Sequence, residues 1–140
     1  MSFREKTAWV MMTLLIAAGG FYAWEVIGHA LAIGSAPPPS GKLAMVYLLI
    51  VIAGTIIGMS SLAGREPDEA SAPVDEREQI AIDKAGNWSG YVLAVPAIAG
   101  VLHYWTHSDG DLLFHTIVGA LMLCQIAEYG SQIWLYRRGV

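Results

Sequence analysis

Four long apolar runs constrain this chain more than any other feature. They cover about residues 7–32, 43–63, 88–105 and 112–135. Each run is close to or above the roughly 20 residues that a helix needs to cross the hydrocarbon core of a bilayer. Because lipid offers the backbone no hydrogen-bond partners, each run is expected to be helical. The sequence therefore predicts an all-α fold, an integral membrane four-helix bundle that forms one domain over residues 1–140.

The first run is longer than the apolar core of a secretory signal peptide, which has about 7–15 residues. We therefore expect it to stay in the protein as a membrane helix. Charged residues make up only 14% of the chain, against about 25% in a soluble domain. The net charge of −4 argues against a nucleic-acid partner, since such partners attract basic surfaces. Phosphate-loop, paired-cysteine and nucleophile-elbow motifs are absent from the sequence, so an enzyme is the less favoured class.

The placement of lysine and arginine predicts the orientation, because these residues concentrate on the cytoplasmic side of membrane proteins. An up-down-up-down bundle with both termini in the cytoplasm places only Lys42 on the outer side. It places the other seven basic residues inside: Arg4, Lys6, Arg65, Arg77, Lys84, Arg137 and Arg138. The N-in, C-in arrangement is therefore predicted.

The predicted cytoplasmic loop, residues 64–87, is the largest water-exposed segment. Its first part, residues 65–72, is polar and is expected to be mobile. The second part predicts a short helix, because Asp75 and Glu78 have the spacing of a capping box. This helix is expected to continue into the third membrane segment. In the outer loop before the last segment, Asp111 is a candidate N-cap for the final helix.

Two short motifs carry a resemblance to a known group of proteins. The chain begins Ser2-Phe3-Arg4-Glu5-Lys6, and Asp75-Glu76-Arg77-Glu78 leads into the third membrane segment. In both respects the chain resembles small four-helix bacterial inner-membrane proteins of unknown function that carry a DERE-type motif before the third helix. The resemblance implies a bacterial origin, a location in the inner (plasma) membrane and the four-helix layout. It implies no activity.

Ionisable side chains in the membrane segments are candidate functional residues, because they are costly to place in lipid. Five of them are expected near the outer surface, and two pairs have the four-residue spacing that puts side chains on one helix face. They are Glu25, His29, His103, His107 and His115. Imidazole and carboxylate ligands suit a divalent transition metal such as zinc. The alternative is that the histidines lie at headgroup level without a metal and that Glu25 pairs with His29.

A second polar group lies in the last membrane segment. Gln125, Glu128 and Gln132 recur at three and four residues and share one helix face. They predict either hydrogen bonds between helices or a proton or ion relay in which Glu128 titrates. Gly54 and Gly58 form a small-xxx-small pair, which lets helix backbones approach closely. This pair predicts a packing face, either within the bundle or between protomers.

Two classes of function are consistent with these patterns. The favoured one is a non-enzymatic membrane protein, surrounded by the lipid bilayer, that acts by self-association or with a cytoplasmic or membrane protein partner. Residues 64–87 would make that contact. The alternative is a protein that binds or transports a metal ion through the outer histidines and Glu25.

Overall fold

The described part of the chain, residues 2–139 of the computed structural model, is built from helices and contains no strand; residues 1 and 140 of the predicted domain lie outside it. The elements are α1 (Phe3–Ile33), α2 (Gly41–Arg65), α3 (Pro67–Ser71), α4 (Glu76–His107) and α5 (Gly110–Arg138). The four longer helices are long and apolar enough to cross a membrane. The prediction of an all-α fold is confirmed, and the four long apolar helices are compatible with a multi-pass membrane protein.

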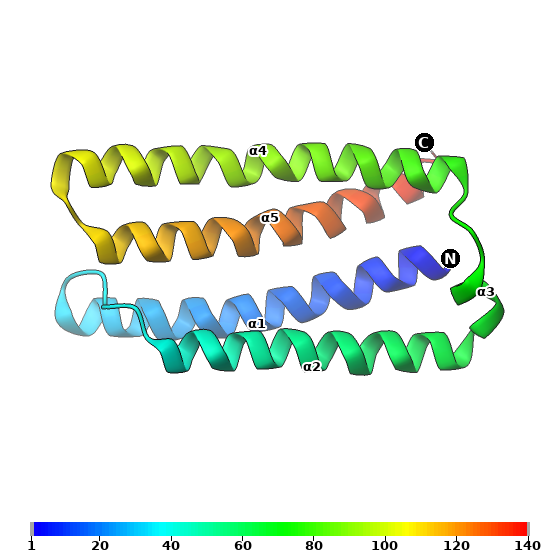
Figure 1. Ribbon diagram of the computed structural model, residues 1–140, viewed down its shortest axis with the longest axis horizontal. Helices are drawn as coiled ribbons and strands as arrows, with labels where there is room; N and C mark the ends of the chain where they lie inside the picture. Colours follow the sequence, from blue (N-terminus) through cyan, green and yellow to red (C-terminus); the bar gives the residue numbers. More distant parts are fainter. Residues whose placement is uncertain (1, 140) are drawn as a thin grey trace.

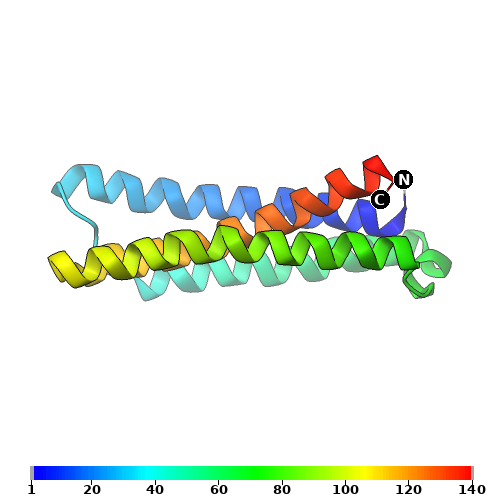
Figure 2. The ribbon, with the colours of Figure 1, turned by 90° about the horizontal axis from the view of Figure 1, so that it is seen from above.

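The four long helices lie side by side in the order α4, α5, α1, α2, and consecutive helices run in opposite directions (Figure 1). The main packing contacts join α4 to α5, α5 to α1, and α1 to α2. Seen from above, the same helices form a shallow layer whose two chain ends lie at one end of the molecule (Figure 2). The bundle is therefore open: α5 and α1 are the inner helices, and α2 and α4 form its two edges.

Small residues bring α4 close to α5. Ala81, Ala85, Ser89 and Gly100 are the buried residues of α4, and Ala81 and Ala85 pack against Leu135 of α5. A Cβ atom added at Gly100 would lie 3.1 Å from Cγ2 of Thr116 and 3.2 Å from a methyl of Leu113. Such spacing of small side chains allows close helix contact in membranes.

The glycine pair of α2 lies against α1. A Cβ atom added at Gly58 would lie 2.8 Å from Cγ1 of Val10, and one added at Gly54 would overlap the methyl groups of Leu14. Thr55, between the two glycines, places its hydroxyl 3.7 Å from Sδ of Met11. The Gly54 and Gly58 face is thus used inside the chain, between α1 and α2.

The remaining surface of α2 is apolar and open. None of its residues is buried, and Met45, Ile52, Ile56 and Ile57 are each more than half exposed. Soluble monomers rarely expose continuous apolar patches larger than a few hundred Å². The outward faces of the bundle are therefore of the kind that lipid covers.

The loop between α2 and α4 differs in part from expectation. Residues 65–72, expected to be mobile, contain the last residue of α2 and the short helix α3, which begins at Pro67. A proline is favourable in the first turn of a helix, where its missing N–H is not needed. The expected continuity of the second part is confirmed, because α4 runs from Glu76 to His107 without interruption.

The helix caps correct two expectations. Asp109, and not Asp111, is the N-cap of α5, and its carboxylate accepts a hydrogen bond of 2.9 Å from the backbone N–H of Leu112. Asp75 does stand at the N-cap of α4, but its side chain makes no capping hydrogen bond. The capping box predicted for Asp75 and Glu78 is therefore wrong. The carboxylate of Glu78, which would complete the box, pairs with Arg4 of α1 instead.

Candidate functional site

The five candidate metal-binding residues are divided among three helices that do not all touch. Glu25 and His29 belong to α1, His103 and His107 to α4, and His115 to α5. The rings of His103 and His107 stack on each other, with centroids 4.2 Å apart and planes 11° apart. Because α5 lies between α4 and α1 (Figure 1), the histidine pair of α4 is separated from the polar pair of α1.

The shared metal site predicted from these five residues is therefore not formed. Within residues 2–139, no three His, Cys, Asp or Glu side chains are grouped so that they hold a metal ion together. A protein zinc site requires three or four such ligands at about 2.0–2.3 Å from the ion. The grouping rested on the depth expected for each histidine, and depth does not determine which helices are neighbours.

His115 has a structural position instead. Its Nε2 atom lies 2.9 Å from the carbonyl oxygen of Pro37, and its Nδ1 atom lies 2.9 Å from the hydroxyl of Tyr22. A carbonyl oxygen only accepts, so Nε2 carries the proton and donates it to Pro37. In the neutral ring Nδ1 then accepts from Tyr22. His115 thereby connects the loop between α1 and α2 to α5, and Tyr22 of α1 joins the same contact.

The polar face of α5 is arranged for hydrogen bonding along the helix. Gln132 is buried, Glu128 is half-buried and Gln125 is exposed. The amide of Gln132 donates to Oε1 of Glu128 over 3.4 Å. Gln125 lines a hollow of about 300 Å³ between α1, α2 and α5, beside Tyr22 and Tyr47. The three residues thus lie near one another, and the contact present is a hydrogen bond within one helix.

The two chain ends and the loop meet in a cluster of ion pairs. Arg4 lies 3.4 Å from Glu78 of α4, and Arg137 of α5 lies 3.2 Å from Glu5. Lys6 lies 2.5 Å from Glu66, which follows α2. Each distance joins a side-chain nitrogen to a carboxylate oxygen. Three consecutive charged residues of α1 therefore contact three different parts of the chain, and we call these three pairs the ion-pair cluster.

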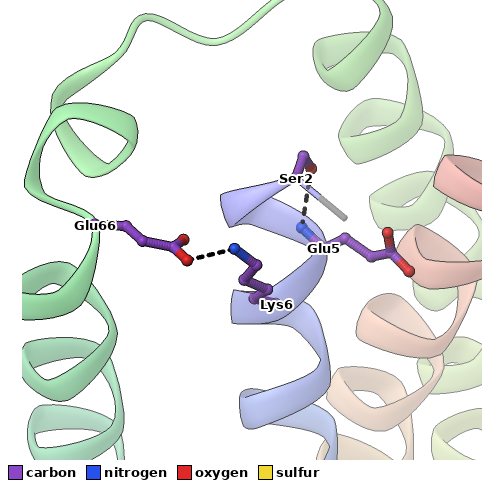
Figure 3. Close-up of polar contacts among 4 residues, drawn as sticks. All are labelled: Ser2, Glu5, Lys6 and Glu66. Carbon is purple, nitrogen blue, oxygen red and sulfur yellow. Dashed lines mark hydrogen bonds and ion pairs between the residues drawn. The ribbon is translucent and has the colours of Figure 1, made fainter.

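Helix geometry explains how neighbouring residues reach different partners. Ser2 is the N-cap of α1, and its hydroxyl accepts the backbone N–H of Glu5 at 3.2 Å. The helix therefore begins at Phe3, and successive side chains point about 100° apart around its axis. Figure 3 shows the result: Lys6 points toward Glu66, while the carboxylate of Glu5 points to the other side, toward α5.

The motif at the start of α4, residues 75–78, has one residue in the ion-pair cluster and three outside it. Glu78 is turned inward to Arg4, whereas Asp75, Glu76 and Arg77 are exposed. Beside them lies a groove of about 170 Å³ with the Arg4–Glu78 pair and Glu69 in its wall. Four exposed acids surround this region, and we call them the acidic surface: Asp68, Glu69, Asp75 and Glu76.

Sequence reasoning found the residues of both motifs but not their pairing. The sequence contained a signal for this pairing. Arg4, Glu5 and Lys6 directly precede the first apolar run, and residues 64–87 carry seven acids and three bases. Comparisons with protein-family models, curated proteins and solved structures give no match to this chain. The resemblance to proteins with a DERE-type motif stays a prediction.

Proposed function

We propose that this chain is a multi-pass protein of a bacterial inner membrane with both termini in the cytoplasm. The support is the distribution of basic residues: Lys42 is the one lysine or arginine that this orientation places outside. The ion-pair cluster lies at the same end of the molecule as both termini (Figure 2). In this orientation it faces the cytoplasm, where water and lipid headgroups surround it.

We further propose that the protein is non-enzymatic and acts by association through this cytoplasmic end. The observation that carries the proposal is that the ion-pair cluster holds the motif at the start of α4 through Glu78 and leaves the other three motif residues exposed. Ion pairs that stay in contact with water contribute little to stability, and both side chains of each of these pairs keep some contact with water. Three of them in one place are better explained by positioning a surface than by stabilising the fold.

The charge of that surface indicates the chemistry of the partner. The acidic surface has four carboxylates, and Arg77 is the exposed base next to it. The acidic surface is repelled by the same surface of a second copy and by the anionic lipids of the inner leaflet. Neither of these is therefore the favoured partner. A protein segment rich in lysine or arginine is the complementary partner.

Cysteine labelling in intact cells tests the orientation. A cysteine replacing Ser40, before α2, is expected to react with a membrane-impermeant maleimide. A cysteine replacing Ser71, at the end of α3, is expected to react only after the cells are opened. Cys124 is replaced by alanine in both variants so that one thiol remains. The opposite labelling pattern would refute the orientation.

Photo-crosslinking tests the association. A photoreactive residue at Glu76 is expected to give one discrete adduct in cells, and the same residue at Lys42 is the control on the other side. Replacing Asp68 and Glu69 by lysine is expected to abolish the adduct, because the partner is attracted by negative charge. An adduct of twice the chain mass would show self-association instead. An adduct that survives the charge reversal would refute the acidic surface as the contact.

A further inference from the structure

A second surface at the cytoplasmic end has the opposite charge and a different shape. Between α4 and α5 lies a groove of about 360 Å³, lined by Trp88, Ala127, Gly130, Ser131 and Trp134. Two tryptophans form its walls, with ring centroids 5.8 Å apart and planes 57° apart. Both rings are more than 40% exposed. We call this feature the tryptophan groove.

Two cations stand above the groove on its cytoplasmic side. The guanidinium carbon of Arg138 lies 4.1 Å from the centroid of the Trp134 ring, a cation–π contact. Lys84 precedes Trp88 by four residues, and Arg138 follows Trp134 by four residues. At 1.5 Å per residue, the Cα atom of each basic residue lies about 6 Å from the Cα atom of its tryptophan along the helix axis. Because α4 and α5 are antiparallel, both cations lie on the same side of the tryptophan pair.

These cations are available for a ligand. Arg137 is held by Glu5, whereas neither Arg138 nor Lys84 forms an ion pair within residues 2–139. Both side chains belong to exposed residues. The neighbouring acid Asp83 accepts a hydrogen bond of 2.8 Å from Gln79 on its own helix.

Along one exposed face of α4, the side chains change from basic to aromatic to apolar. Positions three, four and seven residues apart share a helix face. On this face Arg77 and Lys84 come first, Trp88 and Tyr91 follow, and Val95 comes next. Tyr91 is 67% exposed and Val95 is 68% exposed. Basic, aromatic and apolar side chains thus follow one another from the loop toward the middle of the helix.

We propose that the tryptophan groove binds one anionic glycerophospholipid of the inner leaflet. The phosphate lies between Lys84 and Arg138, and an acyl chain lies over Ala127 and Gly130, beside the paired indole rings. Basic pockets between membrane helices on the cytoplasmic side recognise anionic headgroups, and tryptophan favours the headgroup level. A peptide partner fits less well, because the groove floor is made of small side chains that point into the bilayer.

This inference rests on the proposed membrane insertion and is separate from the acidic surface. The acidic surface repels the anionic leaflet, while Lys84 and Arg138 attract it, so the two surfaces divide the cytoplasmic end between a protein partner and lipid. Which leaflet supplies the lipid depends on the proposed orientation, but the preference of the groove for an anionic lipid does not. A reversed orientation would therefore leave the lipid preference intact in detergent.

Native mass spectrometry of the full chain in mild detergent tests the proposal. Dioleoyl phosphatidylglycerol is compared with dioleoyl phosphatidylcholine, which has the same acyl chains and no net charge. The chain is expected to retain one phosphatidylglycerol with clear preference. Removing a basic residue is expected to weaken binding about fivefold, so the double variant Lys84→Gln, Arg138→Gln is expected to lose roughly 30-fold.

The control is a double variant with the same change of charge at distant positions, Lys42→Gln together with Arg65→Gln. It is expected to bind phosphatidylglycerol as the parent does. A further variant, Ala127→Phe, fills the groove without changing charge and is expected to weaken both lipids. Equal retention of the two lipids by the parent, or an equal loss in both double variants, would overturn the proposal. Circular dichroism of each variant verifies that the helices remain.

Discussion

The contact between α1 and α2 gives the sharpest test of the fold. A Cβ atom at Gly58 would lie 2.8 Å from Cγ1 of Val10, whereas non-bonded carbon atoms prefer about 3.5–4.0 Å. Valine in a helix keeps one χ1 rotamer in about 90% of cases, so Val10 does not rotate away. In Gly58→Ala the two helices must therefore separate by about 0.7 Å or more.

The size of the effect follows from two opposing contributions. Overpacking costs roughly 1–3 kcal/mol, and the higher helix propensity of alanine offsets at most about 1 kcal/mol. We expect Gly58→Ala to lower the free energy of unfolding by about 1 kcal/mol. Gly54→Ala is expected to lose less, although its Cβ would come closer to its neighbour, because the methyl groups of Leu14 end a flexible side chain.

Equilibrium unfolding in mild detergent, followed by far-ultraviolet circular dichroism, measures these differences. Gly20→Ala in α1 is the matched control, since nothing lies within 4 Å of its added Cβ, and it is expected to be at least as stable as the parent. A double-mutant cycle of Gly58→Ala with Val10→Ala is expected to give a favourable coupling of at least about 0.5 kcal/mol. Zero coupling, with Gly58→Ala as stable as Gly20→Ala, would refute the packing.

Three further predictions concern single side chains, each measured by the same unfolding experiment. Asp109→Ala is expected to lower the free energy of unfolding by about 1 kcal/mol, because the carboxylate of Asp109 caps α5. Asp75→Ala is expected to lower it by only a few tenths of a kcal/mol, because the side chain of Asp75 makes no capping bond. Equal losses would contradict the observed caps. Tyr22→Phe is expected to lose about 0.6 kcal/mol with its hydrogen bond to His115, and an unchanged stability would argue against that bond. Glu128→Gln is expected to preserve folding, while Glu128→Lys should lose roughly 2–3 kcal/mol if this half-buried position lies within lipid depth; equal stability of the two variants would place the side chain in water.

The helices of this fold follow from the sequence because lipid leaves the backbone little choice. The apolar runs predicted four helices, and the structure extends each by several residues at one or both ends. The third gains most: its apolar run begins near Trp88, but the helix begins at Glu76. The apolar run predicts only the part of α4 suited to lipid. The earlier part is stabilised by packing, because Ala81 and Ala85 are buried against Leu135 of α5.

The candidate site was less predictable, because it depends on which helices are neighbours. His29 and His103 have similar depths in the sequence, but α5 separates their helices. The capping box at Asp75 is not formed, and the carboxylate of Glu78 pairs with Arg4, a residue more than seventy positions away. Local spacing carries no information on such a distant contact. Gly54 and Gly58 were identified by spacing alone, but only the structure shows that their partner is α1.

The central place of α5 has a consequence for synthesis. The face of α1 with Ala8, Leu15, Ala18 and Tyr22 is the buried face of that helix, and α1 shares its larger contacts with α5 and α2 only. The chain emerges from the ribosome at roughly 5–20 residues per second, N-terminal part first, and α5 ends about a hundred residues after α1. In the proposed membrane location, the first hairpin therefore waits for several seconds with an interior face turned to lipid, until α5 packs against both α1 and α4.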